Sequence, residues 1–241
     1  MMIRRNAVMA LCRKEIRSWF YSPLFYGTVL FMQLFLSLWL YYFRAFFVMD
    51  SASFRAFFSA FPYAYILVVP VITMKSWAEE KKTGTAELLF TMPLSEWELC
   101  LGKFASSFTV LVILLLISLS IPLSLLPLAR FDIGVIVTEY AGAFLLGAAA
   151  LSIGLYLSNL SKNQAAAFLS CAAVLLILMF MNQFTLASGF YFSFLHFISL
   201  SYHFESFARG LLDSRDIAFF LLSTLLFLFL NTRLLVSRKW S

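Results

Sequence analysis

The residues that could do chemistry are few in this chain and lie far apart. His196 and His203 are seven residues apart, a spacing that places both on one face of a helix, and Glu205 is the only close third candidate for a metal site. Histidines at the end of a long apolar segment more often have one polar edge in water than bind a metal. We therefore expect no metal site here.

Other reactive side chains have similarly plain interpretations. Cys12, Cys100 and Cys171 form no C-x-x-C pair, so we expect small apolar side chains that neither bind metal nor form disulfides. Glu139 is the main charge near an apolar segment. We expect it at the outer boundary of that segment, where a carboxylate near a helix N-terminus is favoured, and a role in substrate passage is the alternative.

The motifs of common enzymes are absent from the sequence. The phosphate-binding pattern G-x-x-x-x-G-K-[ST] does not occur, because Gly102-Lys103 is followed by Phe104 and no glycine stands five positions before Gly102. Neither H-E-x-x-H nor G-x-S-x-G occurs. We expect this chain not to be an enzyme and to hold no cofactor of its own.

Composition decides the fold class. The chain has 241 residues, of which 62% are hydrophobic and 12% charged, and its mean hydropathy is +0.90, so it has too little polar surface for a water-soluble domain. Its apolar runs approach the roughly 20 residues that a helix needs to cross a bilayer. The sequence predicts an all-α polytopic membrane protein whose six transmembrane helices cover residues 24–43, 60–75, 104–127, 137–157, 165–186 and 216–236. Pro70 should kink the second span or leave it irregular.

We divide the chain into an N-terminal interfacial helix, residues 1–22, and a membrane domain, residues 23–241. The first segment alternates basic with apolar residues, which is typical of an amphipathic helix lying on an anionic leaflet. Its basic residues are Arg4, Arg5, Arg13, Lys14 and Arg17.

The basic residues are distributed unequally between the two sides of the predicted membrane domain. With a cytoplasmic N-terminus, 13 of the 18 lysines and arginines lie inside, which agrees with the positive-inside rule. We therefore predict a multi-pass protein of the inner (cytoplasmic) membrane with both termini cytoplasmic. The net charge of +6 then needs no nucleic-acid partner.

Residues 76–103 form the only long polar segment, and so much charge must project into water between two spans. We predict a cytoplasmic hairpin on which a soluble partner could push. Five of the chain's twelve acidic residues lie in it: Glu79, Glu80, Glu87, Glu96 and Glu98. Thr83 or Thr85 can cap a short helix there, Pro93 ends it, and Ser95-x-x-Glu98 is a capping box for the next helix.

The segment Glu79-Glu80-Lys81-Lys82-Thr83-Gly84-Thr85-Ala86-Glu87-Leu88-Leu89, followed by Met92-Pro93-Leu94-Ser95 and Leu101-Gly102-Lys103, resembles the first cytoplasmic loop of ABC-2-type transporter permeases. The nearest subgroup is the small six-span permeases of gliding-motility and nitrous-oxide-reductase maturation systems. Only this loop is specific, although the layout of most of the chain is similar.

The resemblance implies a permease subunit that couples ATP hydrolysis by a separate ATP-binding subunit to substrate movement, with export as the expected direction. ATP and Mg would belong to that partner. The permease would form a homodimer or a pseudo-symmetric heterodimer in membrane lipid, and Gly84–Leu89 would be the coupling helix. The residues implied to dock the ATPase are Glu79, Glu80, Lys82, Gly84, Thr85, Glu87, Leu88 and Leu89.

The fourth span carries a face of small residues that includes Gly142, Gly147 and Gly154. Such a face lets another helix approach closely, either within the subunit or across a dimer interface. Two other functions stay open. One is a secondary transporter, for which we find no convincing internal repeat. The other is a membrane anchor or assembly protein without transport.

Overall fold

The computed structural model describes residues 5–43, 54–85, 94–128, 132–188 and 197–239. All regular structure within these ranges is helical, which confirms the predicted all-α class. The long helices are α2 (Pro23–Leu38), α4 (Phe61–Met74), α7 (Glu96–Ser118), α9 (Ile133–Leu160), α10 (Gln164–Ser188) and α13 (Ser214–Lys239). The shorter ones are α1 (Arg5–Phe20), η1 (Trp39–Phe43), α3 (Arg55–Phe58), α5 (Ala78–Lys82), α8 (Ser120–Leu125), η2 (Leu126–Leu128) and α12 (Leu200–Phe207).

The described residues contain six helical segments long and apolar enough to cross a membrane, as predicted. The segments are Pro23–Tyr42, Arg55–Met74, Glu96–Leu125, Ile133–Leu160, Gln164–Met181 and Ser214–Ser237. Several bounds differ from the prediction. The third helix begins at Glu96, because the Ser95 hydroxyl accepts from the Glu98 amide while the Glu98 carboxylate accepts from the Ser95 amide.

Pro70 does not interrupt α4, so the prediction of an irregular segment is wrong. A proline removes a single backbone hydrogen bond, and packed neighbours and hydroxyl side chains compensate for that loss inside a membrane bundle. The Thr73 hydroxyl lies one turn after Pro70 and donates to the Val69 carbonyl at 3.0 Å. α4 runs through Pro70 to Met74, with most of its residues buried among neighbouring helices.

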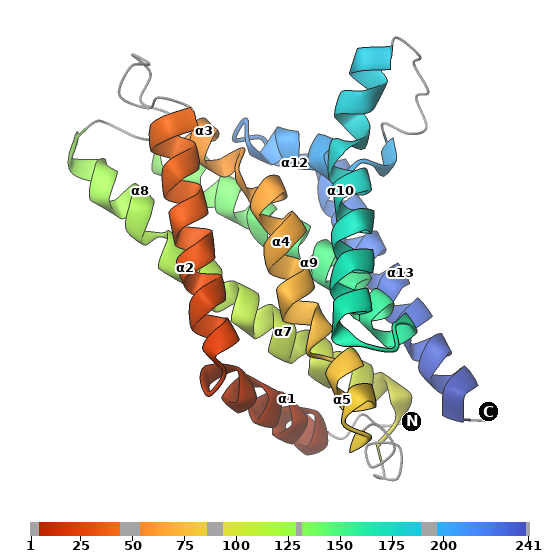
Figure 1. Cartoon of the computed structure of the whole chain (residues 1–241). Helices are drawn as coiled ribbons and strands as arrows, with labels where there is room; N and C mark the ends of the chain where they lie inside the picture. The colour runs from red at the N-terminus through yellow and green to blue at the C-terminus, as the bar shows by residue number, and fades with distance from the viewer. Residues whose placement is uncertain (1–4, 44–53, 86–93, 129–131, 189–196, 240–241) are drawn as a thin grey trace.

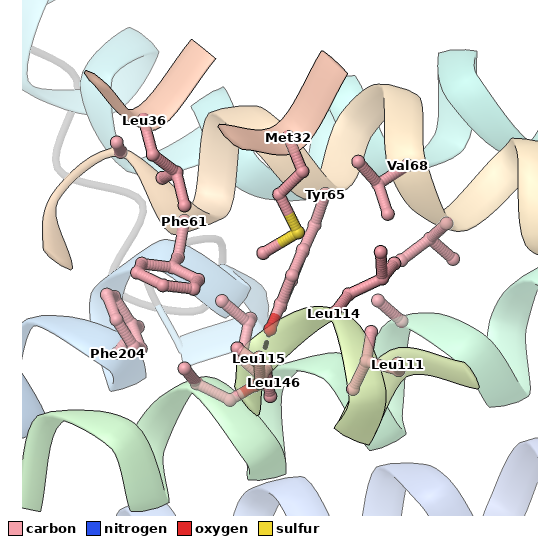
Figure 2. Close-up of a cluster of buried hydrophobic side chains, with 14 of the residues drawn as sticks. Met32, Leu36, Phe61, Tyr65, Val68, Leu111, Leu114, Leu115, Leu146 and Phe204 are labelled. Atoms are coloured by element: carbon pink, nitrogen blue, oxygen red, sulfur yellow. Dashed lines mark hydrogen bonds between the residues drawn. The ribbon is translucent and has the colours of Figure 1, made fainter. Parts of the chain in front are cut away.

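The core of the bundle lies around α4 and α9, whose spans are the most buried of the six, whereas the spans of α2, α10 and α13 are the least buried. Figure 2 shows side chains of α2, α4, α7, α9 and α12 meeting in this core. Among the side chains labelled in Figure 2, Tyr65 carries a hydroxyl, which donates to the Ala143 carbonyl at 3.0 Å. This bond satisfies a buried hydroxyl that would otherwise be costly in an apolar interior.

The two ends of the bundle differ in which short helices they carry (Figure 1). We call the end that holds α1, α5 and the last turns of α13 the α5 end, and the end that holds α3 and α12 the α12 end. At the α5 end, α1 lies crosswise beneath α2 (Figure 1). Ser22 and Pro23 make the corner, where the Ser22 hydroxyl accepts from the Leu24 amide and so begins α2.

Candidate functional site

The predicted polar hairpin begins at α5, and α9 holds the first turn of this helix in place. Trp77, the residue before α5, makes no side-chain capping bond. Instead, the backbone amides of Trp77 and Ala78 donate to the Ser158 hydroxyl at 3.3 and 3.2 Å. A residue 80 positions away therefore does the work of a helix cap, because the first amides of a helix have no partner within it. The start of α5 is thus hydrogen-bonded to α9.

Lys103 on α7 is the centre of the site. Its side chain is 1% exposed, and its ammonium lies 2.7 Å from the Glu80 carboxylate on α5 and 3.4 Å from the Glu15 carboxylate on α1. The ammonium also donates to the Ser76 carbonyl at 2.8 Å and lies 4.6 Å from the centroid of the Trp77 ring. A buried charge is tolerated only when it is paired and hydrogen-bonded, and Lys103 meets this condition through residues of other segments.

The charge state of Glu80 reflects two opposing effects. Burial raises the pKa of its carboxyl above the usual value of 4.5, because the charged form loses water. The Lys103 ammonium lowers this pKa by attraction and by a hydrogen bond, and burial is the larger effect. The Lys103 ammonium therefore favours the charged form of the Glu80 carboxyl, which burial disfavours.

A second lysine, Lys81, lies on α5 itself and connects this helix to the C-terminal end of α9. The Lys81 ammonium donates to the carbonyls of Asn159 and of Ser161, the latter at 3.3 Å. Carbonyls at the C-terminus of a helix lack backbone partners and favour a nearby cation. The Asn159 amide in turn donates to Asn231 on α13 at 2.8 Å. We call Lys103, Glu80, Glu15, Lys81 and their partners on α9 and α13 the coupling junction.

After α5 the chain turns sharply at an exposed surface. Gly84 has a φ of +73°, a left-handed conformation that glycine adopts without strain, and its amide bonds to the Lys81 carbonyl at 3.3 Å. The Thr83 hydroxyl donates back to the Glu79 carbonyl at 3.0 Å. Thr83 thus ends α5, and the short helix that Thr83 or Thr85 was predicted to cap extends into residues outside the described ones. Lys82, Thr83, Gly84 and Thr85 are exposed.

The predicted docking residues therefore divide into three groups. Lys82, Gly84 and Thr85 lie on this exposed surface and Glu79 is half-buried beside it. Glu80 faces inward and is engaged by Lys103, so its carboxylate is not displayed for a partner. Glu87, Leu88 and Leu89 lie outside the described residues.

The main partners of the junction were missed in the sequence. The sequence pattern included Lys103 only as part of the loop motif and did not single out Glu15. Ser158 lies just beyond the predicted fourth span, residues 137–157, whereas α9 continues to Leu160. The available signal was the presence of polar residues within otherwise apolar segments, such as Asn159 and Asn231, because buried amides require partners.

The small-residue face of α9 packs against helices of the same chain. A Cβ added at Gly142 would lie 2.4 Å from Phe207 on α12, one at Gly147 would lie 2.6 Å from Leu111 on α7, and one at Gly154 would lie 2.6 Å from Thr73 on α4. All three glycines are buried in the single chain. A dimer contact through them would require these helices to separate first.

The α12 end contains the groups that the sequence pointed to as candidate metal ligands. His203 is buried, its Nδ1 lies 2.6 Å from Asp216 on α13 and its Nε2 lies 2.9 Å from the Phe197 carbonyl, so the expectation of a water-facing histidine is wrong. Glu205 instead pairs with Arg209 at 2.6 Å. No cluster that could hold a metal occurs among the described residues, and His196 lies outside them.

Glu139 also differs from the prediction. It lies in the second turn of α9 and is 1% exposed, because α9 begins earlier than predicted, at Ile133 after the capping residue Asp132. Neither oxygen of its carboxyl has a hydrogen-bond partner among the described residues. It is therefore a buried carboxyl and not a water-facing helix-end charge.

These features define a class: a six-span helical membrane protein in which a charged junction at one end links a polar hairpin to several spans. Residues 47–233, more than half of the chain, match the family described as ABC-2 family transporter protein. The chain belongs to this family and is a transmembrane permease of the ABC-2 type. A search of curated proteins gives no match.

Proposed function

We propose that this chain is the permease subunit of an ATP-driven exporter, and that α5 with the residues after it transmits movement of a separate ATP-binding subunit to the spans. The coupling junction is the observation that carries this proposal. A force on the exposed surface at Lys82–Thr85 would reach α7 through Lys103, α9 through Ser158 and the carbonyls of Asn159 and Ser161, and α1 through Glu15.

In this mechanism the chain carries no covalent chemistry. Its sequence lacks a phosphate-binding loop, so ATP and Mg would be held by the partner subunit. Two permease subunits, identical or pseudo-symmetric, would alternate between arrangements while two ATPases close beneath the hairpins. The α5 end would then face the cytoplasm at the inner membrane, consistent with the excess of basic residues assigned to that side. Export is favoured because the stretches between spans on the other side are short and leave no room for a domain that captures a ligand.

Docking can be tested by recovery of the ATP-binding subunit with the tagged permease from detergent. We expect Leu88→Asp and Leu89→Asp to abolish recovery, because a charge would enter the apolar face offered to the partner. Lys162→Asp, which places an acid in the exposed turn between α9 and α10, is the matched control and should leave recovery unchanged. Recovery of the ATP-binding subunit with the Leu88 and Leu89 variants at the level of the wild type would contradict the docking assignment.

Glu139 favours one alternative, a secondary transporter driven by a proton gradient. A buried carboxyl in a membrane span, without a hydrogen-bond partner in the part of the chain that the structure describes, is the kind of group that proton-coupled transporters use. In reconstituted vesicles, transport driven by a proton gradient without ATP and abolished by Glu139→Gln would support the alternative. Transport that requires the ATPase and persists in Glu139→Gln would support the ATP-driven permease.

A further inference from the structure

The exposed face of α1 is basic and aromatic without an acidic residue. Within residues 8–21, whose side chains the structure describes, Arg13, Lys14 and Arg17 are exposed, and so are the large side chains of Phe20 and Tyr21. The Arg17 guanidinium lies 5.7 Å from the centroid of the Tyr21 ring. Cations flanked by aromatic side chains favour the boundary between lipid headgroups and acyl chains.

The position of α1 places this face at the membrane surface. α1 ends at Phe20 and the first span begins at Pro23, so α1 lies level with the point where the chain enters the membrane. It runs crosswise to α2 at the α5 end of the bundle (Figure 1). The opposite face of α1 is occupied, since Leu11 packs so closely over Gly102 that an added Cβ would lie 2.8 Å from it.

The acidic residue of α1 explains both the charge of the face and its connection to the rest of the protein. Glu15 is the only acidic residue before Asp50, and it is turned inward to Lys103 at 3.4 Å. The exposed face is therefore left purely cationic. The same lysine holds Glu80 of α5 at 2.7 Å, so α1 and α5 share one buried cation.

We propose that the exposed face of α1 is a binding site for anionic phospholipid headgroups, and that Glu15 and Lys103 transmit its occupancy to α5. Anionic headgroups attract Arg13 and Arg17 and hold α1 in place, which keeps Glu15 against Lys103 and steadies α5. This regulation rests on the proposed function only in assigning α5 to the coupling segment; the lipid site itself does not require an ATPase.

The test is hydrogen exchange of the permease alone in nanodiscs of phosphatidylcholine, with or without about 30 mol% phosphatidylglycerol as the anionic lipid. We expect phosphatidylglycerol to slow exchange in α1 and in α5 of the wild type. Each basic residue near an anionic surface contributes about a fivefold gain in binding, so the double variant Arg13→Gln with Arg17→Gln should lose the response in both helices. High salt should weaken the response, since exposed charges are screened.

Two further variants separate the site from the connection. Glu15→Gln keeps the basic face, so the response of α1 should persist while that of α5 is lost. Lys162→Gln removes one exposed charge from the turn between α9 and α10 and should behave as wild type. Each variant is first compared with wild type for its melting temperature in phosphatidylcholine, so that loss of folding is not mistaken for loss of lipid response.

Four results would overturn the proposal. The lipid site is wrong if phosphatidylglycerol leaves exchange in α1 unchanged in the wild type, or if the double variant responds fully. The connection is wrong if α5 still responds in Glu15→Gln. Protection of α1 that appears only when the ATP-binding subunit is added, in phosphatidylcholine as well, would assign this face to the ATPase. Because none of the lipid measurements uses Leu88 or Leu89, failure of this proposal and failure of ATPase docking are distinguishable.

Discussion

The two ends of the bundle treat their charges differently. At the α5 end one buried cation, Lys103, holds carboxylates from two elements that are far apart in the sequence. At the α12 end the closest pairs join near neighbours: Glu205 bonds to Arg209 four residues on, and His203 bonds to Asp216 thirteen residues on. Glu205 also lies 3.9 Å from Arg55 on α3, but Glu205 and both of its arginines are about half exposed, so water and salt screen these pairs. The comparison teaches that the pairs between distant elements are buried at the α5 end and largely exposed at the α12 end, where His203 and Asp216 form the buried pair among the described residues.

The largest effect should come from Lys103→Met. This change leaves Glu80 and Glu15 without their cation, and breaking a buried ion pair by removing one partner costs about 3–5 kcal/mol. We expect a fall of this size in the free energy of unfolding, measured by detergent-based unfolding. The double variant Lys103→Met with Glu80→Gln should regain part of the lost free energy of unfolding, because the unpaired Glu80 carboxylate is removed. If Lys103→Met unfolds like wild type, the lysine is not the centre of the junction.

The cost of Lys103→Met should also depend on pH. Without the ammonium, burial and repulsion from the Glu15 carboxylate raise the pKa of the Glu80 carboxyl further, opposed only by the weaker attraction of Lys14. A folded-state pKa above the unfolded value means that the folded state binds the proton more readily, so stability is lost as the pH rises through the folded pKa. The variant should therefore unfold more easily at about pH 8 than at about pH 5.5, with a shallower dependence in wild type. If the loss of stability in Lys103→Met were independent of pH, it would be due to lost packing and not to the charge of Glu80.

A smaller effect is expected from Gly142→Ala at the α12 end. The added methyl would lie 2.4 Å from the Phe207 Cβ, so α12 must shift, and overpacking of this kind costs about 1–3 kcal/mol. Gly27→Ala is the control, because nothing lies within 4 Å of a Cβ there. Recovery of the ATP-binding subunit should be normal in both variants. Impaired recovery with Gly142→Ala would mean that the two ends are not independent.

The smallest effect is expected from Arg209→Gln. Glu205 raises the pKa of Arg209 through a hydrogen bond and attraction, but both side chains are half exposed. Exposed pairs contribute little because water and salt screen them. The melting temperature should be unchanged at moderate salt. A clear fall would show that the α12 end depends on its surface charges after all.

Hydropathy located the six spans, because crossing a membrane is a property of each apolar run by itself. The helix bounds were less accurate: the Ser95 capping box was recognised, yet the third span was placed from Phe104 onward, where the charges stop. Pro70 was expected to kink its helix or to leave it irregular; α4 is helical through Pro70, and the kink stays a prediction. Glu139 and His203 were expected to meet water, because the sequence does not reveal which neighbours cover a polar group.

The amino-acid sequence alone determined the fold class, the number of spans and the position of the polar hairpin, all of which follow from the local balance of apolar and charged residues. Its loop pattern also pointed to the ABC-2 family, which the family match confirms. Only the tertiary structure decided that Lys103 joins Glu80 to Glu15 and that Ser158 caps α5. The partner of a buried charge is whichever group the fold brings near it, and that depends on how helices from distant parts of the chain pack together.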